Sequence, residues 1–174
     1  IAVDRDAFLI DPQVDLDLKT LGHALTGNTV SILHAAQEDY EVLFRLTGSI
    51  PSPVFDTQIA YALLNDKISL SLSGLVAEVL GKELSKEETR SDWTKRPLSE
   101  AQCQYAKEDV LVLEPIYEIL CQQLEQAGRI DWMHEEMRSI RERNAINLAD
   151  GDLETQVHKF GNAWRLSPEG MSRL

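Results

Sequence analysis

A β-branched, apolar run at residues 29–35, TVSILHA, leads straight into a segment whose apolar residues recur at helical spacing. The run is typical of an inner strand. The segment that follows predicts a helix over 37–47, with Tyr40 and Phe44 on its buried face. Because a strand that feeds a helix in this way forms a crossover, the helix must pack against a sheet. The sequence therefore predicts an α/β fold.

The rest of the chain adds two early strands and several later helices to this unit. A chain of 174 residues with 43% hydrophobic residues suits one globular domain. Strands early and helices later favour a mixed sheet flanked by helices. The other expected elements are a hairpin from IAV and AFLID, a helix over 15–26, a short strand and an Asp56-capped helix in PVFDTQIAYALLN, a helix in SLSGLVAEVLG, a loop over 82–98, a long helix from a Ser99–Gln102 capping box to Gly128, and a helix over 130–146.

Charge and composition restrict the partners and the location. A net charge of −12 argues against a surface that coats nucleic acid, because such surfaces depend on lysine and arginine. A cluster of basic residues between Lys82 and Lys107 leaves a local basic wall open. The apolar runs are far shorter than the roughly 20 residues of a membrane span, so we expect no membrane association. No obligate protein partner is evident.

The two cysteines bear on the compartment. Cys103 and Cys121 fall on one predicted helix, about 27 Å apart at a rise of about 1.5 Å per residue. Two thiols at that separation cannot form a disulfide with each other. Unpaired cysteines fit a reducing cytoplasm, which is where we expect the protein.

The stretch QYAKEDVLVL places Tyr105 and Asp109 on one face of a helix, four positions apart. Asp109 precedes the apolar run 110–113, where an unpaired carboxylate is costly. Bonding to a core tyrosine hydroxyl is one way to reduce that cost. A bound metal ion is another. The residues alone leave both readings open.

A second acid, Asp39, lies in the first turn of the helix after the strand, in LHAAQEDYEVL. A carboxylate there also suits the helix dipole. Taken together, however, Asp39 and Asp109 are the kind of ligands that hard cations such as Mg²⁺ prefer. A site with two such ions activates water and stabilises the leaving oxygen of a phosphodiester.

Four segments in order carry a resemblance: HAAQEDYEVL, VFDTQIAYALLN, SLSGLVAEVLG and RSDWTKRPLSEAQCQYAKEDVLVLEPIYEIL. This arrangement resembles ribonuclease D and its relatives in the DEDD superfamily of 3′–5′ exonucleases, in the subtype with tyrosine in the third motif. The likeness covers roughly residues 1–146. Its most specific part is SDWTKRPLSEAQCQYAKEDV.

The resemblance implies a ribonuclease H-like mixed sheet flanked by helices, and an activity. Asp39 is then the second-motif acid and Asp109 the third-motif acid, both serving two divalent ions, Mg²⁺ or Mn²⁺. Tyr105 would orient the attacking water. The implied reaction is trimming of RNA 3′ ends, of the tRNA precursor type, with release of nucleoside 5′-monophosphates.

One part of the family pattern is not found. The first motif, Asp-x-Glu on the first strand, should precede the IAV strand. We therefore expect that the chain is truncated at its N-terminus and lacks two of the four acids of the site. Alone, it should be inactive. The resemblance assigns residues 1–146 to the exonuclease domain. It assigns 147–174 to a linker and the start of a helical domain like the helicase-and-ribonuclease-D C-terminal domain, from KFGNAWRLSPEGMSRL.

Three further residues are candidate substrate contacts, each with an ordinary structural alternative. His34 ends the strand, where it either approaches the metals or makes a structural hydrogen bond. Lys95 and Arg96 either touch the substrate backbone or belong to a solvated charge run. Two rival functions also stay open: a 3′–5′ DNA exonuclease of the same superfamily, and a noncatalytic RNA-binding module without the first motif.

Overall fold

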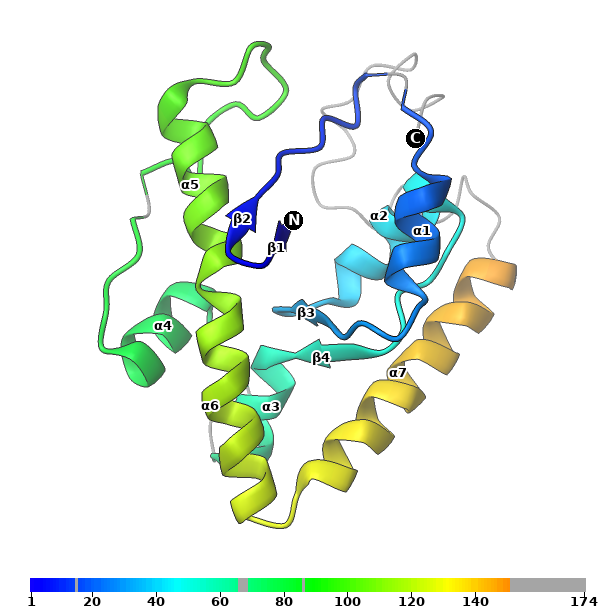
Figure 1. The fold of residues 1–174 in the computed structure, drawn as a ribbon, viewed down its shortest axis with the longest axis vertical. Coiled ribbons are helices and arrows are strands. Elements are labelled where there is room, and N and C mark those ends of the chain that lie inside the picture. Colours follow the sequence, from blue (N-terminus) through cyan, green and yellow to red (C-terminus); the bar gives the residue numbers. More distant parts are fainter. Residues whose placement is uncertain (15, 66–68, 86, 151–174) are drawn as a thin grey trace.

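The computed structural model describes residues 1–14, 16–65, 69–85 and 87–150. It is a mixed α/β structure in which helices surround two small sheets (Figure 1). In chain order its elements are β1 (Ala2–Val3), β2 (Asp6–Ala7), α1 (Lys19–Leu25), β3 (Ser31–Leu33), α2 (Gln37–Thr47), β4 (Val54–Asp56), α3 (Thr57–Leu64), α4 (Leu72–Leu80), α5 (Glu100–Leu111), α6 (Leu113–Gln126) and α7 (Ile130–Asp150).

The expected N-terminal hairpin is present, with shorter strands than its apolar runs suggest. β1 and β2 are antiparallel, and Val3 faces Asp6 across the turn. The two turn residues, Asp4 and Arg5, have φ values of 50° and 69°. Positive φ at both central residues is the geometry of the two-residue turns that suit hairpins, and aspartate tolerates it better than most residues.

The second sheet is the parallel pair that the crossover predicts. β3 and β4 pair in parallel with Leu33 opposite Asp56, so their carboxyl ends lie side by side. α3 starts directly after β4, and α2 starts a short turn after β3. The N-termini of these two helices therefore meet at one edge of the sheet (Figure 1). Asp56 caps α3 as expected, accepting from the backbone N–H groups of Gln58 and Ile59.

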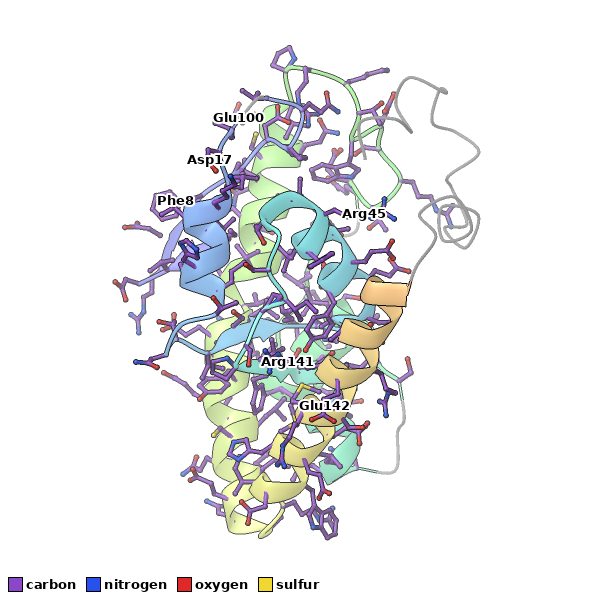
Figure 2. The ribbon with its side chains drawn as sticks, turned by 90° about the vertical axis from the view of Figure 1, so that its right-hand side faces the viewer. Phe8, Asp17, Arg45, Glu100, Arg141 and Glu142 are labelled. Atoms are coloured by element: carbon purple, nitrogen blue, oxygen red, sulfur yellow. The ribbon has the colours of Figure 1, made fainter. Side chains whose placement is uncertain are left out.

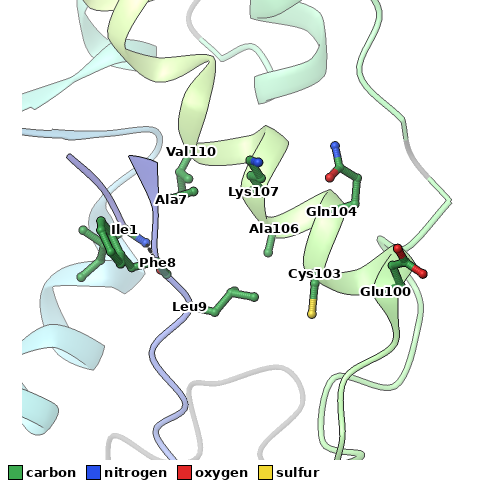
Figure 3. A pocket seen from close by; sticks show the side chains of 10 residues that line it. All are labelled: Ile1, Ala7, Phe8, Leu9, Glu100, Cys103, Gln104, Ala106, Lys107 and Val110. Carbon is green, nitrogen blue, oxygen red and sulfur yellow. Dashed lines mark hydrogen bonds between the residues drawn. The ribbon is translucent and has the colours of Figure 1, made fainter. Parts of the chain in front are cut away.

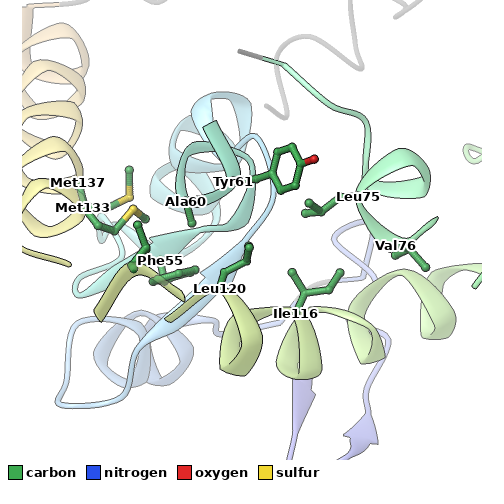
Figure 4. Packing of buried hydrophobic residues seen from close by; sticks show 10 residues of the cluster. Phe55, Ala60, Tyr61, Leu75, Val76, Ile116, Leu120, Met133 and Met137 are labelled. Atoms are coloured by element: carbon green, nitrogen blue, oxygen red, sulfur yellow. The ribbon is translucent and has the colours of Figure 1, made fainter. Parts of the chain in front are cut away.

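The main core lies between the β4–α3 unit, α4, α6 and α7 (Figure 4). The ring of Phe55 from β4 meets Tyr117 of α6 edge-on, with centroids 4.7 Å apart. Burying side chains of this size is the main source of stability, at roughly 1.5–3 kcal/mol each. The fully buried members on the helices are Ala60, Leu75, Val76, Ile116, Leu120, Leu124 and Met133.

Two of the expected helices differ from the structure, one in its start and one in its continuity. The helix expected over 15–26 begins only at Lys19, because Asp17 accepts a hydrogen bond from the Lys19 N–H and forms a turn there. The long helix expected from Ser99 to Gly128 is broken at Val112 into α5 and α6. Pro115 explains the break, since it cannot donate a hydrogen bond to the carbonyl of Leu111.

The start of α5 and the end of α6 agree with the sequence, whereas the end of α7 does not. The Ser99–Gln102 capping box is formed, and Gly128 follows α6 with a φ of 65°. α7 continues to Asp150, four residues beyond the expected end at 146. Of the linker and C-terminal domain expected over 147–174, residues 147–150 belong to α7, and the rest lie outside the described residues. Among the helices that the structure describes, none combines the length and apolarity needed to cross a bilayer.

Candidate active site

Tyr105 and Asp109 lie on one face of α5, as their spacing predicts, and both are half-buried. The pKa of Asp109 is raised above 3.8, first by burial and then by the charge of Glu108. The Tyr105 hydroxyl opposes this rise through its interaction with the carboxylate. Within the described residues Asp109 forms no ion pair. The environment thus disfavours its charge unless a cation is supplied.

The loop over 82–98 fixes the Tyr105 side chain. The Tyr105 hydroxyl lies 3.3 Å from the Thr89 hydroxyl, and its ring lies 6.0 Å from the Trp93 ring, centroid to centroid. Trp93 is held in turn by its indole N–H, which donates to the Glu88 carbonyl at 3.1 Å. The loop therefore orients the tyrosine. Thr89 was not singled out from the sequence, because no local pattern links it to a residue sixteen positions away.

The Gln102 side chain joins the same loop to the start of α5. Its side chain is buried, and its amide nitrogen donates to the Ser91 hydroxyl at 3.1 Å and to the Asp92 carbonyl at 3.2 Å. Its amide oxygen accepts from the Ser99 N–H to complete the capping box. One glutamine thus stabilises the start of α5 and the loop that contacts Tyr105.

Asp39 lies in the first turn of α2 and is half-buried. Its pKa is raised above 3.8, first by burial and then by the charges of Asp56 and Glu38. In the part of the chain that the structure describes, no ion pair neutralises Asp39 and no hydrogen bond joins it to Asp109. The charge of Asp56 therefore acts on Asp39, and the Tyr105 hydroxyl acts on Asp109.

His34 forms a bond between the two strand-to-helix turns. Its Nδ1 lies 3.0 Å from the Thr57 hydroxyl, which itself donates to the Leu33 carbonyl at 3.1 Å. The Nε2 atom is buried and has no hydrogen bond among the described residues. A structural bond is thus present, and a substrate contact stays a prediction.

The stability of the fold should depend on the charge of His34. Burial lowers its pKa below 6.5, against the opposing effects of Asp56 and the Leu70 backbone. Below pH 6.5 the unfolded chain binds a proton that the folded chain rejects, so stability falls as pH falls through this window. We expect urea unfolding midpoints to drop between pH 7.5 and 5.5. The drop should shrink in His34→Asn, and an unchanged drop in that variant contradicts the assignment.

Lys95 and Arg96 differ in how they are used. Lys95 is exposed, with its ammonium 3.9 Å from the Asp92 carboxylate. The Arg96 guanidinium makes two bonds to Asp11, at 2.6 and 2.8 Å, and donates to the Trp93 and Lys95 carbonyls. These bonds fasten the loop to the segment after β2 and hold the pKa of Asp11 at about 2. Contact of either residue with a substrate stays a prediction.

One hollow of the described structure lies away from these residues. A space of about 340 Å³ separates the N-terminal hairpin from the opposite face of α5 (Figure 3). Phe8 and Leu9 border it, and Phe8 lies at the outer surface of the molecule (Figure 2). Neither Asp39, Tyr105 nor Asp109 lines it. Among the described residues, no group of three or more histidine, cysteine, aspartate or glutamate side chains is arranged to hold a metal ion.

Comparison with known proteins identifies the family. The sequence profile described as 3′–5′ exonuclease matches residues 1–125. Ribonuclease D of Pseudomonas paraeruginosa is 40% identical over 172 residues, which are 98% of this chain and 44% of that protein. Ribonuclease D of a Shewanella species is 35% identical over 95% of this chain and 42% of its own length. The chain thus spans less than half the length of these relatives.

Solved structures agree. RNase D of Escherichia coli, described as an exoribonuclease involved in structured RNA processing, is 34% identical with a TM-score of 0.73, over 87% of this chain and 40% of that chain. NrnC of Brucella melitensis with bound Mg²⁺ is 32% identical with a TM-score of 0.62, over 74% of this chain and 65% of that chain. The expected ribonuclease H-like fold and the sequence resemblance are both confirmed. The chain belongs to the 3′–5′ exonuclease domain family, within the ribonuclease D group.

Proposed function

We propose that this chain forms the core of a metal-dependent 3′–5′ exoribonuclease. The observation that carries the proposal is the pairing of Tyr105 with Asp109 on α5, with the tyrosine hydroxyl held by Thr89. A phenol beside an uncompensated carboxylate suits the positioning of a water for attack on phosphorus. Membership of the 3′–5′ exonuclease family supports the same reaction.

The residues present fit part of a metal site. Asp39 and Asp109 are both half-buried carboxylates with raised pKa values, and the charged groups that raise them are other acids. A divalent cation would remove this cost, and carboxylate oxygens are the ligands that Mg²⁺ and Mn²⁺ accept. Asp39 and Asp109 would therefore hold two such ions together with further ligands. The structure of the Brucella relative with Mg²⁺ supports this choice.

When bound, the ions lower the pKa of a coordinated water and stabilise the charge on the leaving oxygen. The chain itself supplies orientation. Tyr105 holds the water with its hydroxyl, and the Thr89 and Trp93 contacts keep the phenol from rotating away. The Asp109 carboxylate interacts with the same hydroxyl, which lowers its pKa against the effect of burial. The product of attack at the terminal phosphodiester is a nucleoside 5′-monophosphate.

The proposed substrate is RNA with a free 3′ end, of the tRNA precursor type, in the cytoplasm. The Escherichia coli relative is described as acting on structured RNA. The net charge of −12 does not favour tight binding of RNA by the general surface of this domain. Lys95, exposed beside the Tyr105 loop, is a candidate backbone contact. We propose that the remaining grip on RNA comes from a helical domain following residue 146.

The proposal is tested on the full-length gene product with matched RNA and DNA oligonucleotides that carry a 5′ label. We expect the RNA to shorten stepwise from its 3′ end in Mg²⁺ or Mn²⁺, with no shortening in EDTA and with nucleoside 5′-monophosphates as products. Faster degradation of the DNA would favour the DNA exonuclease alternative. Binding of RNA without hydrolysis in any divalent metal would favour the noncatalytic module.

A further inference from the structure

The Asp56 carboxylate lies between the first turns of two helices. Asp56 ends β4 and is 3% exposed. Its Oδ1 accepts from the N–H groups of Gln58 at 2.8 Å and Ile59 at 3.4 Å, which caps α3. The same carboxylate also reaches the turn before α2, where Ala35 donates to Oδ1 at 3.1 Å and Ala36 donates to Oδ2 at 2.8 Å.

This second pair of bonds is more than a helix cap requires. Serine or asparagine would cap α3 with a single oxygen. Oδ1 already accepts from both turns, and only a carboxylate has a second oxygen that can accept from the Ala36 N–H as well. The strand register brings the Asp56 carboxylate close to Ala35 and Ala36, because Asp56 stands opposite Leu33 and the turn to α2 begins just after Leu33.

The chain around Ala35 needs such an anchor. Ala35 has a φ of 56°, the left-handed region that side chains other than glycine seldom adopt. A conformation of this kind persists where surrounding bonds impose it. The Asp56 bonds to Ala35 and Ala36 do so directly, and the His34–Thr57 bond joins the same two turns a second time.

Asp39 lies in the first turn of α2, three residues after Ala36. Ala36 is the residue before this turn. The first residue of this turn, Gln37, is also held, because its side-chain amide donates to the Asn144 side chain of α7 at 2.9 Å. Tyr40, next to Asp39, is 1% exposed, so the helix cannot rotate freely about its axis.

We propose that Asp56 is a positioning residue for Asp39, fixing the start of α2 against α3 so that the Asp39 carboxylate meets the metal at a defined place. This inference rests on the proposed function, since it assumes that Asp39 is a metal ligand. Groups that hold metal ligands in place typically contribute 10- to 100-fold to metal affinity.

The main test is Mn²⁺ binding to the full-length gene product, measured by calorimetry in the absence of RNA. Asp56→Asn keeps an oxygen for the α3 cap but presents an NH₂ group to the Ala36 N–H, which cannot bond to it. We expect Mn²⁺ affinity to fall about 10-fold or more. Asp56→Glu keeps the charge but moves the oxygens, and we expect a similar loss. Wild-type Mn²⁺ affinity in Asp56→Asn overturns the proposal. So does wild-type affinity in Asp56→Glu together with a loss in Asp56→Asn, because the charge alone would then explain the effect.

The matched control is Ser71→Ala. Ser71 caps α4 by accepting from the Gly74 N–H at 3.2 Å, and α4 carries none of the candidate site residues. This variant should lose stability as a cap variant does, yet bind Mn²⁺ like the wild type. If it lost Mn²⁺ affinity as Asp56→Asn does, general destabilisation would explain both losses and the positioning role would be refuted.

Amide hydrogen exchange on the wild-type protein covers the case in which the Asp56 variants do not fold. The Ala36 and Gln58 N–H groups share one carboxylate, so Mn²⁺ should slow exchange at both by similar factors. Exchange at Ala36 that ignores Mn²⁺ overturns the proposal. Failure of the proposed function is distinguishable, because Asp39→Asn would then bind Mn²⁺ as tightly as the wild type.

Discussion

Replacing Asp109 by asparagine is expected to abolish metal-dependent hydrolysis while leaving the fold intact. The carboxylate is the proposed third-motif acid and metal ligand, so its loss is expected to lower kcat/KM by about 10³-fold or more. Asparagine has nearly the same size and can still accept from Tyr105. Activity is measured on a labelled RNA oligonucleotide with the full-length gene product, and the fold is checked by circular dichroism.

The same variant should gain stability without metal. Burial raises the pKa of Asp109, so above pH 3.8 the folded state is penalised for its charge, and stability falls as pH rises through this window. A neutral asparagine removes that penalty, and its melting temperature at pH 7 in EDTA should exceed that of the wild type. A stability gain on loss of an active-site charge is a common trade-off.

Glu108→Gln is the control for the loss of activity. Glu108 neighbours Asp109 and its side chain accepts from Gln104 at 2.7 Å, which places it on the helix surface network rather than at the candidate site. This variant removes one negative charge at the adjacent position and should hydrolyse RNA at close to the wild-type rate. If Asp109→Asn kept wild-type activity, the nuclease assignment of this site would be wrong.

Replacing Tyr105 by phenylalanine is expected to lower kcat by about 10²-fold, within the range of lost acid–base and water-positioning groups. KM for RNA should change little, because the phenol is assigned to the water and not to the substrate. The ring contact with Trp93 needs no hydroxyl, so the melting temperature should stay near that of the wild type. Single-turnover kinetics separate the chemical step from product release.

Two further variants test whether the fall in kcat depends on the position of the Tyr105 hydroxyl. Thr89→Val removes the hydroxyl that lies 3.3 Å from the Tyr105 hydroxyl, and we expect a smaller fall in kcat than in Tyr105→Phe. Tyr117→Phe removes a hydroxyl from α6, where the ring packs against Phe55 in the core, and should keep the wild-type rate. Equal rates in Tyr105→Phe and the wild type would show that the tyrosine serves only in packing.

The local signals of the sequence located most elements. The bounds of α2 agree with the expected helix over 37–47, and the caps at Asp56 and Ser99 are formed as expected. Such signals act over three or four residues, within the span of one helical turn, so they can be read from the chain. Misplaced boundaries also have local causes, as with Pro115 in the first turn of α6.

The sequence by itself determined the periodicities, the caps and the helical spacing of Tyr105 and Asp109, because each depends on neighbours along the chain. Only the tertiary structure decided that Thr89 meets the Tyr105 hydroxyl, that Arg96 is taken up by Asp11, and that Asp56 serves two helices. Those partners are 16, 85 and 20 residues apart. A bond between such distant groups forms only where packing brings them together, and no local pattern records it.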